Sequence, residues 1–314
     1  MKKITQYILL ISFITGFFSC EKEIDIAIPD RERKIVINSL FTSDETLTVN
    51  LTKSLSIIDR ADVIFLNDAV VKLYENDNFI ENLQFVTNGN YVSSFNLINA
   101  VNYKVEVERN GIIASAVNSI PEPIEIINID TNTIRLFDFD YLECIINFQD
   151  NPNENNYYMF SLDNIKTDIY EYYDNGVLIS DTVTYNNSYY ESDDIIVENW
   201  LYINEQTYIL FADHLISGKK YGLNIRVEHT NSYYYPDISF NDVDSSYIHF
   251  NLFSVTEEYY KYFKTFSMHR ESRENPFAEP VQVFSNVENG LGVFAGFSSN
   301  SDSIQFFSKP FIGK

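Results

Sequence analysis

Residues 102–119 read NYKVEVERNGIIASAVNS, and this stretch indicates the class of the fold. Tyr103, Val105 and Val107 alternate with charged side chains. This period of two predicts a strand with one buried face and one face in water. An Asn-Gly pair at 110–111 separates this strand from a second apolar run, and such a pair predicts a two-residue hairpin turn. The stretch therefore predicts two adjacent antiparallel strands.

The same alternation recurs along the chain, for example at residues 47–52 and 221–228. Segments rich in Asn, Asp and Gly separate such runs, as expected for turns between strands. These segments occur at residues 75–78, 88–90, 173–176 and 217–220. No repeat with a period of about 20–50 residues is visible, which argues against a propeller or a solenoid. We therefore predict an all-β protein.

A proline-rich segment at residues 120–126, IPEPIEI, predicts a boundary between two domains. The residue before a proline favours extended backbone, so this segment suits a linker. The roughly 90 residues before it contain about seven short strands, which is the size of an immunoglobulin-like sandwich. We predict an immunoglobulin-like β domain over residues 34–120. We expect residues 121–314 to form a second β-rich domain, either a sandwich or an open barrel.

One segment departs from the period of two. Ser254 precedes Glu257 by three residues, a spacing typical of a capping box at the start of a helix. Apolar side chains then follow helical spacing, including Tyr259 and Phe263. We predict a helix over about residues 255–271, packed across a sheet of its own domain. Binding of a partner by the same apolar stripe is the less favoured alternative.

The N-terminus has the pattern of a secretory signal. Two lysines precede a short apolar run at residues 8–18, and Ser19 and Cys20 follow it. The run is shorter than the roughly 20 residues that cross a bilayer. The stretch resembles a bacterial lipoprotein signal, in which the cysteine becomes the lipid-modified first residue of the mature chain. We therefore predict a signal peptide over residues 1–19 and an acylated tether over residues 20–33, with a simple secretory signal as the alternative.

Charged residues follow the cysteine directly: Glu21, Lys22, Glu23 and Asp25. They resemble the short signal that directs Bacteroidota lipoproteins to the outer face of the outer membrane. We expect a lipid-anchored outer-membrane protein that faces the cell exterior. An ordinary solvated tether is the alternative reading of the same charges.

Composition excludes several classes of function. The first 19 residues carry two lysines and no acid, so their removal changes the formal net charge from −23 to −25. Such a balance argues against nucleic acid as a partner, and it favours either a solubilised surface or a cationic partner. The only cysteine besides Cys20 is Cys144, which excludes a disulfide framework. Because Cys144 lies in an apolar run, we expect a buried thiol.

Motifs that carry catalysis or bind metal ions are not evident. The histidines show no metal-ligand spacing, and no G-x-S-x-G elbow is present. Residues 290–296, GLGVFAG, do not match a dinucleotide-binding loop. Oxygen-rich segments at residues 150–156 and 241–246 favour turns over calcium loops. We predict a non-enzymatic protein without cofactor or metal.

Two sets of residues remain as candidate sites of other kinds. Exposed aromatic side chains can stack on sugars, and the candidates for this are Trp200, Tyr233, Tyr234 and Tyr235. The alternative explanation is that aromatic residues suit strands. The triplets around Thr182 and Ser303 resemble the acceptor sequence of the Bacteroidota O-glycosylation system.

Several motifs together resemble one family across nearly the whole mature chain. They include KIVINSLFT at 34–42, AVVKLYEND at 69–77, DNPNENNYYMFSL at 150–162, and NPFAEPVQVFSNVENGLGVFAGFS at 275–298. Their order and spacing resemble the Bacteroidota lipoprotein family called domain of unknown function 4249. The resemblance implies a surface or outer-membrane lipoprotein often encoded beside TonB-dependent receptors.

We therefore expect an accessory partner of a TonB-dependent transporter or of another envelope complex, anchored to the outer membrane by its N-terminal lipid. The alternative is a surface lipoprotein that binds glycans or nutrients through exposed aromatic side chains. A hydrolase with a pair of carboxylates is disfavoured, because 45 acidic residues make such pairs uninformative.

Overall fold

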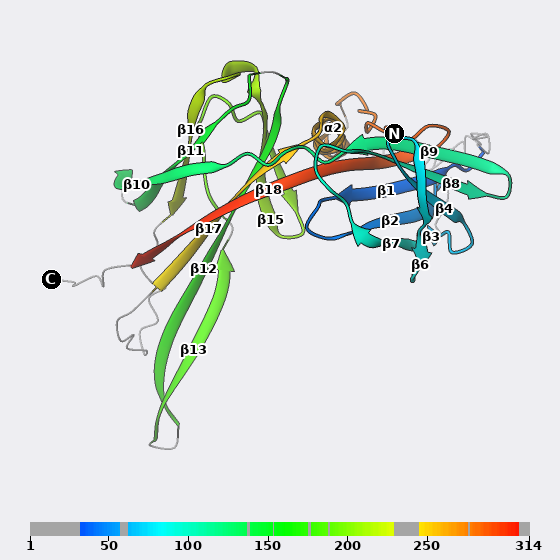
Figure 1. The fold of residues 1–314 in the computed structure, drawn as a ribbon. Coiled ribbons are helices and arrows are strands. Elements are labelled where there is room, and N and C mark those ends of the chain that lie inside the picture. The colour runs from blue at the N-terminus through cyan, green and yellow to red at the C-terminus, as the bar shows by residue number, and fades with distance from the viewer. Residues whose placement is uncertain are drawn as a thin grey trace, which may run out of the picture.

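Strands make up most of the protein. The computed structural model describes residues 32–56, 62–136, 139–152, 154–174, 177–187, 189–228, 245–275 and 277–307. In this part of the chain a single α-helix, α2, accompanies the strands (Figure 1). The all-β class predicted from the sequence is therefore confirmed.

The first sandwich encloses its core between two sheets. One sheet contains β1 (Ile35–Phe41), β2 (Thr46–Lys53), β3 (Ile64–Phe65), β6 (Gln84–Phe85) and β7 (Asn90–Asn96). The other contains β4 (Val70–Glu75), β5 (Asn78–Asn82), β8 (Asn102–Arg109) and β9 (Ile112–Ser119). Ile37, Leu51 and Val105 are fully buried between the sheets, and their neighbours along each strand point away from the core, as the period of two predicts.

The hairpin predicted at 110–111 is present. β8 and β9 pair as far as Arg109 and Ile112, which leaves Asn110 and Gly111 as the two turn residues. Their φ angles are 51° and 78°. Positive φ at both positions is what a type I′ turn requires. The turn predicted at residues 173–176 includes residues 175–176, which lie outside the described residues.

The second sandwich has a core of its own. One sheet contains β12 (Tyr157–Asp174), β13 (Val177–Asn187), β14 (Asn199–Ile203), β15 (Gln206–Ala212) and β17 (Ser245–Val255). The facing sheet contains β10 (Ile126–Leu136), β11 (Phe139–Gln149) and β16 (Lys220–Glu228), and a short 3-10 turn, η1, covers Asp213–Leu215. Phe148, Phe160 and Phe250 are fully buried between them. The described strands form a sandwich and no barrel, so the open-barrel alternative is wrong.

One long strand, β18 (Leu291–Phe307), belongs to both sandwiches (Figure 1). Its first part, to Gly296, runs parallel to β1, and the rest pairs antiparallel with β17. A single sheet of 11 strands therefore passes through the whole molecule. Phe294 from β18 lies in the first core. The C-terminal strand thus completes the first sandwich, an arrangement that the sequence analysis does not anticipate.

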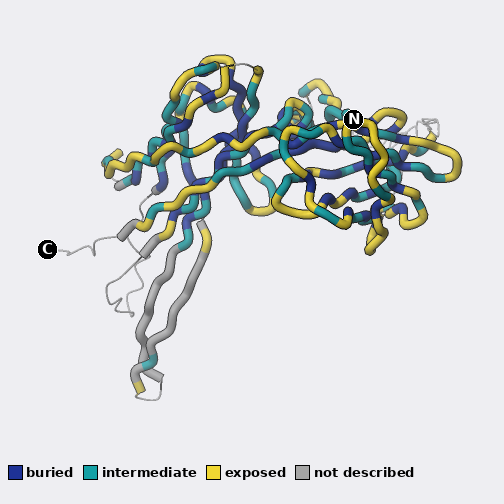
Figure 2. The backbone as a smooth tube through the Cα atoms, viewed as in Figure 1, coloured by how far each residue is buried: buried dark blue, intermediate teal, exposed yellow. Residues whose placement is uncertain are grey.

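Helix α2 spans Glu257–Glu274 and packs on the shared sheet, on the face opposite the second core. Tyr259 and Phe263 lie there in one buried cluster with Met159, and the Tyr259 hydroxyl contacts Met159 Sδ. The helix therefore packs against a sheet of its own domain, as predicted. The burial pattern in Figure 2 shows the buried positions concentrated along the paired strands. In the described part of the chain, α2 included, no helix is long and apolar enough to span a membrane.

The predicted helix is present and begins at Glu257, but the predicted cap at Ser254 is wrong. The capping residue is Thr256, whose hydroxyl accepts a hydrogen bond from the Tyr259 N–H. Ser254 is still part of β17, and its hydroxyl accepts from the Ile124 N–H instead. Pairing of β17 with its neighbours holds the chain extended through Val255, so the helix cannot begin earlier.

Candidate functional site

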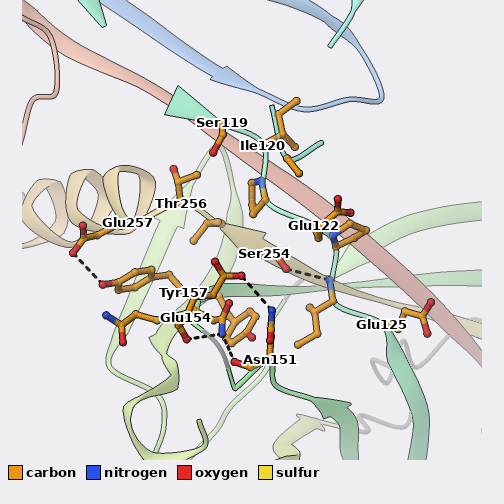
Figure 3. A pocket seen from close by; sticks show the side chains of 18 of the residues that line it. Ser119, Ile120, Glu122, Glu125, Asn151, Glu154, Tyr157, Ser254, Thr256 and Glu257 are labelled. Atoms are coloured by element: carbon orange, nitrogen blue, oxygen red, sulfur yellow. Dashed lines mark hydrogen bonds between the residues drawn. The ribbon is translucent and has the colours of Figure 1, made fainter. Parts of the chain in front are cut away.

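An open cleft of about 880 Å³ lies where the two sandwiches meet (Figure 3). The linker of residues 120–125 forms one wall, the loop of residues 149–156 forms a second, and the start of α2 forms a third. Junctions between domains are preferred places for ligand sites. We therefore treat this cleft as the candidate functional site.

The linker wall is held extended against the shared sheet. Its two prolines favour extended backbone in the residues that precede them. The Ile124 N–H donates to Ser254 Oγ over 3.1 Å, and the Ile126 N–H donates to Asn300 Oδ1 over 2.9 Å. These bonds join the linker to β17 and β18, and so fix one wall of the cleft.

The helix wall presents two acidic side chains. Glu257 accepts a hydrogen bond from the Tyr157 hydroxyl over 3.1 Å and forms an ion pair with Lys261 at 3.0 Å. The bond from Lys261 outweighs burial and lowers the pKa of Glu257. Glu258, next to it, accepts from the amide of Asn118. Carboxylates at this position also suit the positive end of the helix dipole.

The loop wall is built on a buried carboxylate. Asp150 is 1% exposed and accepts hydrogen bonds from the Tyr158 hydroxyl over 2.5 Å and from the Gly218 N–H over 2.7 Å. Burial, and then the bond to Asp150, raises the pKa of Tyr158. Asn156 donates to the carbonyl of Asn151 over 2.8 Å. The oxygens of this loop therefore stabilise its own turn.

These contacts give no support to calcium binding by the two oxygen-rich segments. Among the described residues, no group of three His, Cys, Asp or Glu side chains is placed to hold a metal ion. Residues 241–244 of the second segment lie outside the described residues.

The cleft is rich in hydrogen-bond acceptors and negative charge. Its described lining contains five glutamates and no Lys, Arg or His. Two of them, Glu122 and Glu125, are exposed on the linker and have no hydrogen-bond or ion-pair partner among the described residues. The lining also contains no cysteine. Such a surface is suited to a ligand that brings hydrogen-bond donors and positive charge.

Of the site residues predicted from the sequence, none that the structure describes lines the cleft. Cys20 and Tyr233 to Tyr235 lie outside the described residues. Thr182 is in strand β13, and its side chain is likewise outside what the structure describes. Ser303 is exposed on β18. Trp200 is 39% exposed on β14, with its ring 5.6 Å from that of buried Tyr190.

Cys144 is buried in an apolar core, as predicted from the sequence. Cys144 is 0% exposed between the sheets of the second sandwich. Burial raises the pKa of its thiol to about 12. A thiol in this state is a packing residue and is poorly suited to act as a nucleophile.

The cleft was not predicted from the sequence, because its walls come from three separate segments, and the start of α2 at Glu257 lies more than 100 residues after the other two. The one local signal was the pair of prolines, which marked a boundary.

The last of the family-like motifs builds the seam between the sandwiches. Gly296 approaches β9 so closely that a Cβ there would lie 2.0 Å from the carbonyl oxygen of Ser119. Gly292 has φ of 107°, and its Cβ would lie 2.1 Å from the carbonyl oxygen of Ile37. Only glycine fits such close approaches without movement of the backbone. The motif therefore shapes the fold beside the cleft.

Comparison with known proteins confirms the family that the motifs resemble. A search of curated proteins found no match. A family model described as domain of unknown function (DUF4249) matches residues 21–303, which is nearly the whole chain. The protein therefore belongs to the DUF4249 family.

Proposed function

We propose that this protein is a non-enzymatic accessory lipoprotein of the outer membrane, anchored through Cys20 and facing the cell exterior. In this proposal it binds a TonB-dependent transporter or another envelope protein. The signal-like N-terminus and the strongly negative charge of the chain support the proposal. The partner binds through the cleft between the two sandwiches.

The observation that carries the proposal is the cleft itself. It is open and acceptor-rich. Two of its walls, the linker and the start of α2, are hydrogen-bonded to β18, the strand that both sandwiches share. A preformed site loses little conformational entropy when it binds, which favours affinity. The described lining lacks the His, Cys and Lys side chains on which most acid–base and nucleophilic catalysis depends, which suits binding better than turnover.

The test is co-isolation of the full chain, tagged at its C-terminus, from gently solubilised outer membrane, followed by mass spectrometry. We expect one outer-membrane protein in near-stoichiometric amount. The variant Glu122→Arg/Glu125→Arg should lose that protein. The matched variant Glu45→Arg/Glu279→Arg makes the same change of charge at exposed positions outside the cleft lining and should retain it. Recovery of the wild-type chain alone would contradict the proposal.

The anchor is tested separately. Cys20→Ser should release the chain from the membrane fraction, because several acyl chains hold a protein on a bilayer far more firmly than protein contacts alone. Membrane retention of this variant in the absence of any partner would contradict the lipid anchor.

A second candidate function, glycan binding, is favoured by one observation. Trp200 and Tyr202 are 39% and 56% exposed, and they share one face of β14, which is the terminal strand of its sheet. Wild-type protein should then bind glycans on an array, and Trp200→Ala/Tyr202→Ala should not. The control Phe277→Ala removes an exposed aromatic side chain from a loop after α2. Equal signals from all three proteins would exclude this role.

A further inference from the structure

We infer that the cleft binds an extended segment that carries lysine or arginine side chains, supplied by the partner protein. The inference rests on the proposed function and names the chemistry of the ligand for the same site. It is argued from the size of the cleft, from its charges and from one buried hydroxyl beneath the linker.

Charge complementarity determines the sign of the ligand. All charged side chains in the described lining are glutamates. Glu257 and Glu258 already have partners in Lys261 and Asn118, whereas Glu122 and Glu125 have none among the described residues. Two free carboxylates on one wall are available to an incoming cation. The same two carboxylates would repel an anionic segment.

The dimensions of the cleft favour an organic cation over a metal ion. A volume of about 880 Å³ is within the usual range for sites that hold ligands of many atoms. No three His, Cys, Asp or Glu side chains of the described chain converge as metal ligands. Ammonium and guanidinium groups need only hydrogen-bond acceptors at about 2.7–2.9 Å, and carboxylates supply these without a fixed coordination sphere.

Aromatic surface in the cleft suits the same cations. Tyr157 lines the cleft (Figure 3). Its ring centroid lies 4.8 Å from that of Tyr260. Its hydroxyl is bonded to Glu257, which fixes the ring beside a carboxylate. The face of a tyrosine ring attracts Lys and Arg side chains.

A buried hydroxyl at the same junction is a further observation that does not involve these charges. Ser298 is 3% exposed, and its Oγ has no hydrogen-bond partner among the described residues. It is paired directly with Ser254, which lines the cleft. Directly paired residues point to the same face of a sheet, so Ser298 lies behind the cleft lining, on the face to which the linker is bonded at Ser254. Buried polar groups are usually satisfied, and a water between this hydroxyl and the lining residue Ser254 would satisfy it.

The experiment measures binding of two probes to the full-length chain in detergent. The probes are a five-residue peptide of alternating lysine and glycine and the same peptide with glutamine in place of lysine. Isothermal titration calorimetry is run at about 0.05 M salt, where charges are weakly screened. The proteins are wild type, Glu122→Gln/Glu125→Gln, and the matched variant Glu45→Gln/Glu279→Gln, and circular dichroism confirms that each is folded.

We expect the lysine peptide to bind wild type and the matched variant alike. The cleft variant should bind it about 5- to 10-fold more weakly, as expected for the loss of two ion pairs. The glutamine peptide should bind no better to wild type than to the cleft variant. Equal affinity of both variants for the lysine peptide would overturn the inference.

The two proposals fail in different ways. Loss of the membrane partner with unchanged affinity for the lysine peptide would overturn the inference and leave the proposed function standing. A variant that loses peptide binding but keeps its membrane partner would overturn the proposal that this partner binds through the cleft. The cationic ligand of the cleft would then come from another source.

Discussion

Asn118 and Glu258 are 140 residues apart in the chain, and the Asn118 Nδ2 donates to Glu258 Oε2 over 2.7 Å. The same amide accepts, through Oδ1, a hydrogen bond from the Gly296 N–H over 3.0 Å. Asn118 is on β9 of the first sandwich, and Glu258 is in the first turn of α2 on the shared sheet. One buried side chain therefore uses both its donor and its acceptor to join the two parts of the molecule beside the cleft.

Asn118→Ala should destabilise the protein by about 1–3 kcal/mol, because it leaves the Gly296 N–H and the Glu258 carboxylate without their partner. The free energy of unfolding is measured by urea denaturation. Asn132→Ala, at an exposed position of β10, is the control and should change stability by less than about 0.5 kcal/mol. Equal effects of the two substitutions would show that the junction does not depend on this amide.

Gly296→Ala should destabilise by about 1–3 kcal/mol or more, because its Cβ would overlap the carbonyl oxygen of Ser119. Gly111→Ala is the comparison. A Cβ there meets nothing within 4 Å, and the effect should be limited to backbone strain of about 1 kcal/mol at φ of 78°. Thermal unfolding of both variants distinguishes steric overlap from strain, and a milder effect at Gly296 than at Gly111 would contradict the close approach.

Stability should fall in acid partly through Glu198. Burial tends to raise the pKa of this carboxyl, but hydrogen bonds from Tyr260 and Lys264 outweigh it, and the pKa lies below 4.5. A lowered pKa in the folded state means that the contribution is present above pH 4.5 and is lost as the pH falls through the folded pKa. The difference in unfolding free energy between wild type and Glu198→Gln should therefore shrink on acidification below pH 4.5.

Lys264→Gln provides a second test of this cluster. It removes the cation that lies 2.9 Å from Glu198 Oε2 but retains the carboxyl. The pKa of Glu198 should rise towards 4.5. The acid-dependent loss of stability should therefore be smaller, and complete at a higher pH, than in wild type. An unchanged pH profile in this variant would contradict the assigned cause.

Thiol titration tests the burial of Cys144 and the predicted lipid on Cys20 together. Burial holds the pKa of the Cys144 thiol at about 12, so a water-soluble disulfide reagent should not react with it in folded protein. In denaturant, chain purified from membranes should show one reactive thiol, because acylated Cys20 is blocked and Cys144 is the only other cysteine. Two thiols would contradict lipidation, and reaction in the native state would contradict burial.

Local patterns determined much of the fold. Alternation of Tyr103, Val105 and Val107 determined a strand, because side chains in extended backbone point to opposite faces at every step. The Asn-Gly pair at 110–111 determined a turn, since its φ preferences do not depend on distant contacts. The apolar surroundings of Cys144 in sequence were sufficient to predict its burial.

Only the tertiary structure decided where the sandwiches meet. The parallel pairing of β1 with β18 joins residues more than 200 positions apart, and no local preference encodes it. Because β17 stays paired through Val255, the cap of α2 is Thr256 and not Ser254, the residue predicted from the sequence. The cleft and its glutamates follow from that junction, because packing alone brings the linker, the loop and the helix together.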